Sequence, residues 1–259
     1  MPETTLVIDA HIHLYPMFDL AQTIMHAQRN MKTADAHAVK IWLLTERADC
    51  AVFQRLLTEG RIGGKPLLRT ADAEVLLLPD ESLYIMAGTQ IITREGLELC
   101  ALATSSRIDD RKMTAAQGIA YLLDRGALVS INWAPGKWWG KRGVVVRELL
   151  AQPPQPGVFI GDTAMRPCFW PTPQLMREAV RNGWRIVAGS DPLPFKGEEK
   201  SFGRYTFQVT AAWNPQAPLQ SLRSALMRPD AILSCRGSRR GAFEFVRRQS
   251  QIMREKGKR

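Results

Sequence analysis

The stretch Leu6-Val7-Ile8-Asp9-Ala10-His11-Ile12-His13 decides the fold of this chain. It begins as an apolar run typical of a buried strand and ends in two of the four histidines. Because strand side chains alternate between faces, His11 and His13 point the same way and Ile12 points the opposite way. Two imidazoles at a strand end make half of a site for a divalent cation such as zinc, iron or manganese. The alternative is a pair of capping or core histidines.

Length and composition indicate an ordinary globular protein. The chain has 259 residues, enough for one α/β barrel or two small domains, with 45% hydrophobic and 23% charged residues. No apolar run approaches the ~20 residues that span a bilayer, and the N-terminus lacks the basic region of a signal peptide. The four cysteines are widely spaced, which favours neither a zinc ribbon nor a disulfide framework. We therefore expect a cytoplasmic location and no membrane span.

The positive charge is concentrated near the C-terminus. Between Arg223 and Arg259 there are eleven Lys and Arg against three acidic residues, which accounts for +8 of the net charge of +10. A basic C-terminal helix can hold nucleic acid or an acidic membrane surface. Cations near a helix C-terminus also suit the helix dipole, and no helix-turn-helix or RNA-binding aromatic pattern accompanies them. A solvated helix end is the favoured interpretation, with nucleic-acid binding through this tail as the alternative.

Strand and helix patterns alternate along the chain, as in a parallel α/β sheet or barrel. We predict one domain over residues 1–259, with a core over about 6–207 and closing helices in 208–259. Four short strands in the middle look like hairpins attached to the barrel. The predicted helices are 18–31, 50–57, 115–125, 144–150, 174–182, 219–227 and 242–254. The predicted strands after the first are 39–44, 74–78, 83–87, 89–93, 97–103, 128–132, 158–160 and 185–188.

Asp191 follows the predicted strand 185–188 in a Gly-Ser-Asp-Pro loop. In such a barrel the functional side is the carboxyl end of the strands, where His11 and His13 also lie. Asp191 is a candidate third ligand, or a catalytic base for a metal-bound water, whose pKa the metal lowers to about 7. The alternative is an aspartate that only stabilises a turn. Together with the histidine pair, the ligand interpretation is favoured.

The segment Lys137-Trp138-Trp139-Gly140-Lys141-Arg142-Gly143 follows another predicted strand. Lys137, Lys141 and Arg142 could clamp a phosphate or carboxylate, and Trp138 could stack on a base or sugar. The helix that follows adds positive potential for an anion. The equally favoured alternative has the tryptophans packed beneath the loop and the cations solvated.

Two aspartates and one arginine complete the candidate residues. Asp162 and Arg166 follow the predicted strand 158–160, where Asp162 could orient a metal ligand or pair with Arg166. Arg166 is also a candidate contact for the substrate. Asp9, on the first strand, is expected to support the site by hydrogen bonds to neighbouring backbone. His26 and His37 are expected at the surface or rim.

Three motifs together resemble a known family. Asp9-Ala10-His11-Ile12-His13, then Gly88-x-Gln90-Ile91-x-Thr93, then Gly189-Ser190-Asp191 occur in the order found in the PHP (polymerase and histidinol phosphatase) domain. The resemblance extends from about Leu6 to Phe207. It implies a distorted (β/α)7 barrel of the TIM-like kind, a cluster of divalent metals and hydrolysis of phosphoesters.

The chain departs from the PHP pattern at several ligand positions. Thr45-Glu46-Arg47 replaces Thr-Asp-His, and Gln90 replaces a bridging glutamate. Asn132-Trp133-Ala134-Pro135 stands where the family has His-Pro, and no histidine follows Asp191. We therefore expect one zinc, manganese or iron ion held by His11, His13 and Asp191, with Glu46 or Gln90 as further ligands, in place of a trinuclear cluster.

Three functions remain open from the sequence. The first is a PHP-like metal-dependent phosphoesterase that uses a metal-activated water and acts on a small anionic, phosphorylated substrate. The second is a degenerate barrel without catalysis that serves as a binding or scaffold protein. The third is hydrolysis of an amide or lactone on a related barrel. The missing ligands favour the second, and the histidine pair with Asp191 favours the first.

Overall fold

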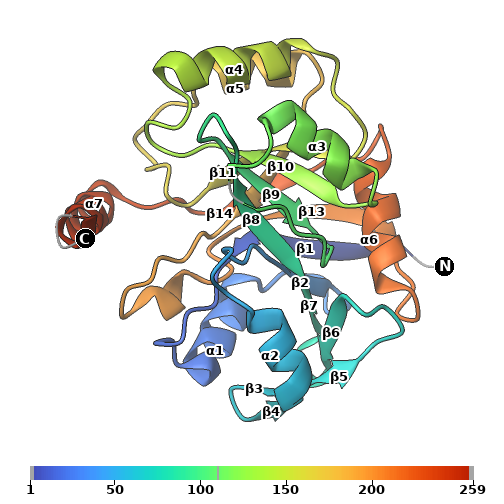
Figure 1. Ribbon diagram of the computed structural model, residues 1–259. Helices are drawn as coiled ribbons and strands as arrows, with labels where there is room; N and C mark the ends of the chain where they lie inside the picture. The colour runs from blue at the N-terminus through green and yellow to red at the C-terminus, as the bar shows by residue number, and fades with distance from the viewer. Residues whose placement is uncertain (1–2, 110, 257–259) are drawn as a thin grey trace.

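The computed structural model describes residues 3–109 and 111–256, which fold into two sheets flanked by helices (Figure 1). One sheet has seven strands in the order β14-β13-β1-β2-β7-β6-β5, and the other has five in the order β12-β11-β10-β9-β8. The seven-stranded sheet consists of β1 (Glu3–Ile12), β2 (Val39–Leu44), β5 (Leu68–Arg69), β6 (Val75–Leu78), β7 (Leu83–Met86), β13 (Tyr205–Ala212) and β14 (Ser234–Gly237). The other contains β8 (Gly88–Ile92), β9 (Glu98–Leu102), β10 (Leu128–Asn132), β11 (Val158–Thr163) and β12 (Ile186–Gly189). A separate pair is formed by β3 (Arg61–Ile62) and β4 (Lys65–Pro66).

The helices between residues 20 and 181 cover the outer faces of the two sheets, as Figure 1 shows. Apolar side chains of α1 and α2 pack with Val7 and Trp42 of the seven-stranded sheet. Those of α3, α4 and α5 pack with Val129 and Ile160 of the other sheet. A third core, which includes Ile8 and Phe159, brings together side chains of both sheets. The helices are α1 (Leu20–Asn30), α2 (Val52–Glu59), α3 (Ala115–Leu123), α4 (Gly140–Ala151), α5 (Gln174–Arg181), α6 (Pro218–Met227) and α7 (Ala242–Lys256), with short 3-10 turns η1 (Pro79–Glu81) and η2 (Glu198–Ser201).

Local sequence signals explain several element boundaries. The Asp19 side chain accepts hydrogen bonds from the backbone of Ala21 and Gln22, so α1 begins where a capping residue occurs. Thr114 and Gln117 form the reciprocal capping box at the start of α3. The predicted hairpins are confirmed as well, because β6 pairs with β7 and β8 with β9 in antiparallel register.

The predicted mixed α/β class is confirmed, whereas the described strands do not close into one hydrogen-bonded barrel. The reason is that β13 pairs antiparallel along one edge of β1, which therefore cannot form a ladder with β12 on that edge. The sheets still meet at both sides. The Asp191 amide donates to the His11 carbonyl at 2.9 Å, and Glu46 forms an isolated bridge to Thr89.

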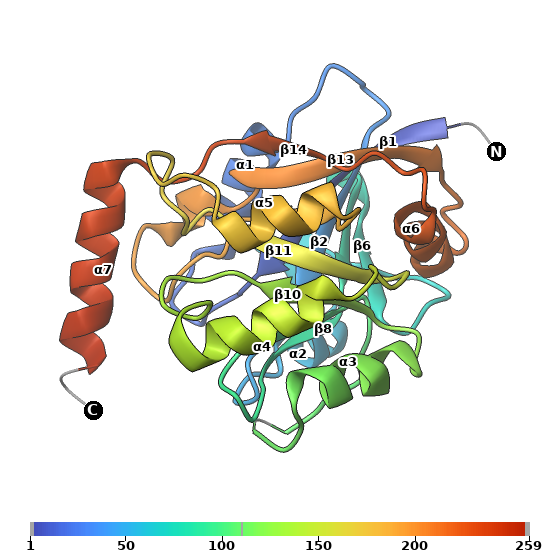
Figure 2. The same cartoon turned by 90° about the horizontal axis from the view of Figure 1, so that it is seen from above.

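The predicted closing helices of residues 208–259 are present, but this segment also contains the end of one strand and the whole of another. Strand β13 runs to Ala212, and β14 pairs with it from Ser234 to Gly237. The helices α6 and α7 do occur in this segment, and α7 stands at one side of the molecule, apart from the other helices (Figure 2). Within the described ranges, no helix is long and apolar enough to cross a membrane.

Candidate metal centre

Strand β1 delivers both histidines to the same side. Ile12 packs in the core with α1 and α2, while the Nε2 atoms of His11 and His13 lie 3.0 Å apart on the opposite face. The register between β1 and β2 shifts between Asp9 and Ile12, which marks an irregularity just before the site. Both rings are buried, with 4% and 7% of the residue exposed. The alternation predicted for this stretch is therefore confirmed.

Asp191 approaches the histidine pair from the loop after β12. Its Oδ1 atom lies 3.7 Å from His11 Nε2 and 3.8 Å from His13 Nε2. Its backbone has a φ of +48°, a left-handed conformation that costs a residue other than glycine about 1–3 kcal/mol. Surrounding contacts hold it there, including the hydrogen bond to the His11 carbonyl. The carboxylate is thus fixed toward the imidazoles at an energetic cost.

The three donor atoms fit a divalent metal ion. They all lie within 4.8 Å of one another. Ligands at about 2.0–2.1 Å in tetrahedral geometry stand about 3.3 Å apart, close to the spacings of 3.0–3.8 Å between these atoms. Two imidazoles and a carboxylate are ligands that suit zinc, iron and manganese. His11, His13 and Asp191 can therefore hold one such ion and leave positions open for water or substrate.

The pKa values of the two imidazoles shift in opposite directions, although burial lowers both. Burial, the neighbouring His11 and Arg47 hold the pKa of His13 well below its usual value. For His11, burial lowers the pKa, but interactions with Cys100 and with the carboxylate of Asp191 outweigh it and raise the pKa to about 10. Two cationic rings at this distance repel, so the pair holds one proton at most. A bound cation would take the place of that single positive charge.

Neighbouring side chains fix the orientation of both rings. The backbone of Thr45 and the side chain of Gln90 lie beside His13 and act to raise its pKa. His11 Nδ1 lies 3.2 Å from the Asn132 amide nitrogen and 3.9 Å from the Cys100 thiol. Such contacts orient histidines that bind metals.

Two glycines allow the strand ends to approach this closely. A Cβ atom at Gly189 would lie 2.3 Å from the Cβ of His11 and 2.7 Å from its backbone nitrogen. A Cβ atom at Gly161 would lie 1.9 Å from the Asn132 side-chain oxygen. Both positions therefore require glycine for the histidine and asparagine to occupy their observed places.

Asp9 joins β1 to the loops beside the site. Its carboxylate accepts hydrogen bonds from the backbone of Ser190 at 2.8 Å and of Gly203 at 3.0 Å, and from the Ser190 hydroxyl. Burial raises its pKa to about 6 despite these hydrogen bonds. Asp9 thus makes the predicted hydrogen bonds to neighbouring backbone, and its role in supporting the histidines stays a prediction.

The two further ligand candidates lie at different places. Gln90 contacts His13, at the edge of the site. Glu46 is not among the three grouped donors in the part of the chain that the structure describes. Its carboxylate accepts hydrogen bonds from the Phe53 backbone and, at 2.7 Å, from Arg107. A metal role for Glu46 or Gln90 stays a prediction.

Two of the predicted contacts for an anionic substrate already have partners within the fold. Lys137 pairs with Glu98 at 3.1 Å, and Arg142 donates to the Gly136 carbonyl at 2.8 Å. Trp138 is buried, whereas Lys141 is exposed.

Asp162 and Arg166 form a buried pair, the second of the two arrangements expected from sequence. Arg166 donates to both carboxylate oxygens of Asp162, at 2.8 and 2.6 Å. The Tyr205 hydroxyl adds a hydrogen bond at 3.0 Å. A substrate-binding role for Arg166 and a ligand-orienting role for Asp162 stay predictions.

Sequence reasoning missed several neighbours of the site. The Tyr15 ring lies 5.7 Å from that of His13, and its hydroxyl is hydrogen-bonded to Arg47. Burial raises the pKa of Tyr15. Cys100 and Asn132 contact His11 from separate strands. Arg47 was visible only as an exception to a motif, and Cys100 had no local signal, because its place depends on sheet pairing.

Comparison with protein-family models gives no match, and neither does comparison with curated proteins. Among solved structures, PsfC from Pseudomonas syringae PB-5123 is similar over 98% of this chain and 99% of its own, with a TM-score of 0.62 and 15% identity. The lesion-specific endonuclease PfuEndoQ from Pyrococcus furiosus has a TM-score of 0.52 and 10% identity. That match covers 89% of this chain and 58% of the endonuclease.

A third similar structure is a two-domain protein from Bacteroides vulgatus, described as containing a predicted PHP-like metal-dependent phosphoesterase. It matches 90% of this chain and 64% of its own, with a TM-score of 0.48 and 15% identity. This chain shares its fold with PsfC and PfuEndoQ. Likenesses at these identities extend to the fold and leave the chemistry to be argued from the site.

Proposed function

We propose that this chain is a metal-dependent phosphoester hydrolase with one divalent ion held by His11, His13 and Asp191. The observation that carries the proposal is the convergence of these three donor atoms at the carboxyl end of β1 and β12. A metal bound there would supply an activated water with a pKa of about 7 and a positive charge for an anionic group.

The residues around the ligands have separate roles in this proposal. The depressed pKa of His13 keeps its imidazole neutral, so that a lone pair is free for the metal. Arg47 is close enough to His13 to lower its pKa, and its guanidinium would donate hydrogen bonds to a phosphoryl oxygen. Lys137 lies in the loop after β10 and Lys141 in the first turn of α4, where they can meet the outer part of an anionic substrate.

The choice of phosphoesters is supported by the PHP-like motifs and by the cations near the site. One protein with a similar fold, PfuEndoQ, is described as an endonuclease. A shared fold is compatible with many reactions, so the ligand set and Arg47 carry the argument.

The experiment combines metal analysis with hydrolysis assays. Purified protein supplied with zinc, manganese or iron should bind about one ion per chain and hydrolyse p-nitrophenyl phosphate or its bis-ester. Loss of groups that only support a ligand costs about 10- to 100-fold in affinity or activity, so His13→Ala should cost more than about 100-fold. His37→Ala, at an exposed histidine outside the site, is the matched control. Turnover unchanged in His13→Ala, or turnover of lactones or amides with none of phosphoesters, would contradict the proposal.

A binding protein without catalysis is the second candidate. It is favoured by Glu46, whose carboxylate is engaged by Arg107 and Phe53, and by the neutral amide of Gln90. Both features reduce the number of anionic ligands at the site. One tightly bound ion per chain, lost in His13→Ala, without turnover of any ester or amide would favour this second function.

A further inference from the structure

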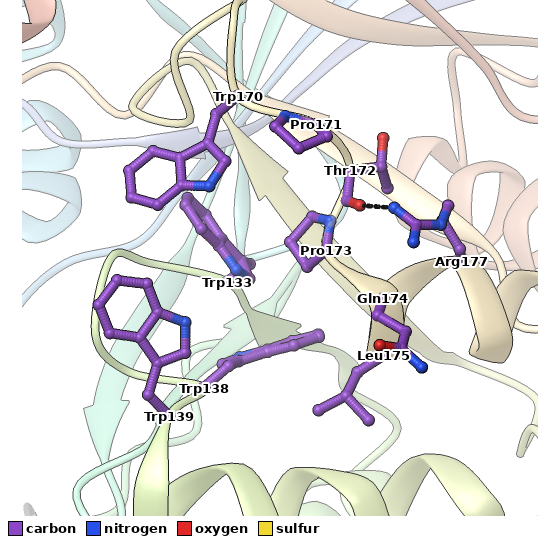
Figure 3. Close-up of a pocket in the computed structure, with 10 residues that line it drawn as sticks. All are labelled: Trp133, Trp138, Trp139, Trp170, Pro171, Thr172, Pro173, Gln174, Leu175 and Arg177. Carbon is purple, nitrogen blue, oxygen red and sulfur yellow. Dashed lines mark hydrogen bonds between the residues drawn. The ribbon is translucent and has the colours of Figure 1, made fainter.

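A cavity of about 370 Å³ lies beyond the carboxyl ends of β10 and β11 (Figure 3). Four of the seven tryptophans line it: Trp133, Trp138, Trp139 and Trp170. We refer to it as the tryptophan cavity. Its volume falls within the range of about 300–1,000 Å³ that is typical of sites for small molecules. The opposite wall is formed by the segment 171–177, with two prolines and Arg177.

The polar groups of this cavity are mainly hydrogen-bond donors. Trp138 Nε1 donates to the Asn132 carbonyl at 2.9 Å. The indole N–H groups of Trp133, Trp139 and Trp170 are not hydrogen-bonded to the residues that the structure describes, and none of them is fully buried, so they are open to a ligand or to solvent. Trp133 is only 2% exposed, and a ligand that covers its N–H without accepting from it would leave that group unpaired, which is unfavourable. The cavity thus offers aromatic walls and donors that need acceptors.

The chemistry of the walls excludes several kinds of ligand. Indole faces attract cations, but no Asp or Glu lines the cavity and Arg177 does, which disfavours a cation. An aliphatic chain would leave the three indole N–H groups unpaired. A sugar needs acceptors for its hydroxyl hydrogens, and the lining side chains offer only those of Thr172 and Gln174.

We propose that the tryptophan cavity binds a planar heteroaromatic ring with acceptor atoms along its edge, the chemistry of a nucleobase. Such a ring stacks on indole faces and accepts from the free N–H groups. The inference rests on the proposed function in that the ring belongs to the substrate whose phosphoester meets the metal.

Asn132 connects the cavity with the metal centre. Its side-chain amide lies 3.2 Å from His11 Nδ1, and its carbonyl accepts from Trp138. The next residue along the chain is Trp133, which lines the cavity. One substrate can therefore have its ring and its phosphate on the two sides of this strand end.

The test measures binding without catalysis. Isothermal titration in EDTA would compare adenosine, cytidine and uridine with ribose 5-phosphate, which lacks the base, and with a methyl glucoside. Trp139→Ala and Trp170→Ala should weaken nucleoside binding by about 5- to 150-fold each, the strength of stacking on one ring. Trp139→Phe keeps a ring and should restore most of the affinity. Phe169→Ala, an exposed aromatic residue outside the lining, is the matched control.

Each outcome decides the question. Nucleoside binding that is lost in the alanine variants and kept in Trp139→Phe supports the proposal. Equal affinity for ribose 5-phosphate, preference for the glucoside, or affinities unchanged in both alanine variants overturn it. A mononucleotide and a short single-stranded oligonucleotide then distinguish a free nucleotide from a strand end as the source of the base.

The two proposals fail in different ways. Since EDTA removes the metal, nucleoside binding reports on the tryptophan cavity alone. Absence of metal-dependent turnover alongside intact nucleoside binding would contradict the hydrolase and leave the cavity assignment standing. Turnover of p-nitrophenyl phosphate without nucleoside binding would contradict the cavity assignment only.

Discussion

Two groups of ionisable side chains flank the loop that follows β12, and they are built in opposite ways. His11, His13 and Asp191 all offer lone pairs, so they cannot satisfy one another fully. Glu198, Arg240 and Arg248 carry complementary charges, and 0%, 0% and 3% of these residues is exposed. A group whose members pair with each other is structural. A group whose atoms all offer lone pairs needs a further partner, such as a cation. The difference separates the candidate site from the scaffold that holds it.

The ion-pair group connects α7 to the loop that carries Asp191. Glu198 accepts hydrogen bonds from Arg240, at 3.1 and 2.5 Å, and pairs with Arg248 of α7. It also accepts the backbone N–H of Leu193 at 3.1 Å, two residues after Asp191. The C-terminal helix therefore contributes to the placement of Asp191, the proposed metal ligand.

The largest expected effect comes from removing the carboxylate of the ion-pair group. Glu198→Ala leaves Arg248 buried without its ion-pair partner and leaves Arg240 with Glu244 alone, which costs about 3–5 kcal/mol of the free energy of unfolding. Urea denaturation followed by circular dichroism measures it. Glu199→Ala, at the next acidic residue, should change stability by less than about 1 kcal/mol. Equal, small effects in both variants would show that the ion-pair group is not structural.

A smaller effect on stability is expected from crowding His11, one of the proposed metal ligands. Gly189→Ala places a methyl group against the backbone of His11, so β1 and β12 must separate at a cost of about 1–3 kcal/mol. Metal affinity should fall as well, because Asp191 follows two residues later. Gly241→Ala has open space around the new methyl group and is the control. Unchanged metal affinity in Gly189→Ala would show that the close contact between β1 and β12 does not determine metal binding.

The comparison also shows what the sequence can reveal. The alternation of His11 and His13 is a property of one strand, and Asp191 follows a recognisable strand end, so all three could be predicted. The partners Glu198 and Arg240 stand 42 positions apart and have no shared local pattern. The same holds for β13, whose pairing with β1 also prevents the predicted closed barrel. Local periodicity predicts elements, but long-range pairing decides which elements meet.

Acid should weaken the ion-pair group in a predictable direction. Burial tends to raise the pKa of Glu198, but Arg240 and Arg248 outweigh it and hold that pKa below its usual value. A carboxyl with a depressed folded pKa stabilises the fold above its unfolded pKa of about 4.3, and this contribution is lost as pH falls through the folded value.

The difference in unfolding free energy between the wild type and Glu198→Gln should therefore stay constant from about pH 7 to pH 5 and shrink in stronger acid. Urea titrations at several pH values measure it. A difference that grows as the pH falls would mean that Glu198 is protonated in the folded state.

The smallest effect is expected from a change at Glu46. It tests whether this residue belongs with the ion pairs or with the proposed metal ligands. Its carboxylate is engaged by Arg107 and the Phe53 backbone, as in the ion-pair group, although it stands at a position where the PHP pattern has a metal ligand. If these contacts define its role, Glu46→Gln should change metal affinity by less than about threefold. Asp191→Asn should reduce it by more than about 100-fold, beyond the loss typical of groups that only support a ligand. Competition with a fluorescent chelator measures both, and a large loss in Glu46→Gln would place Glu46 among the ligands.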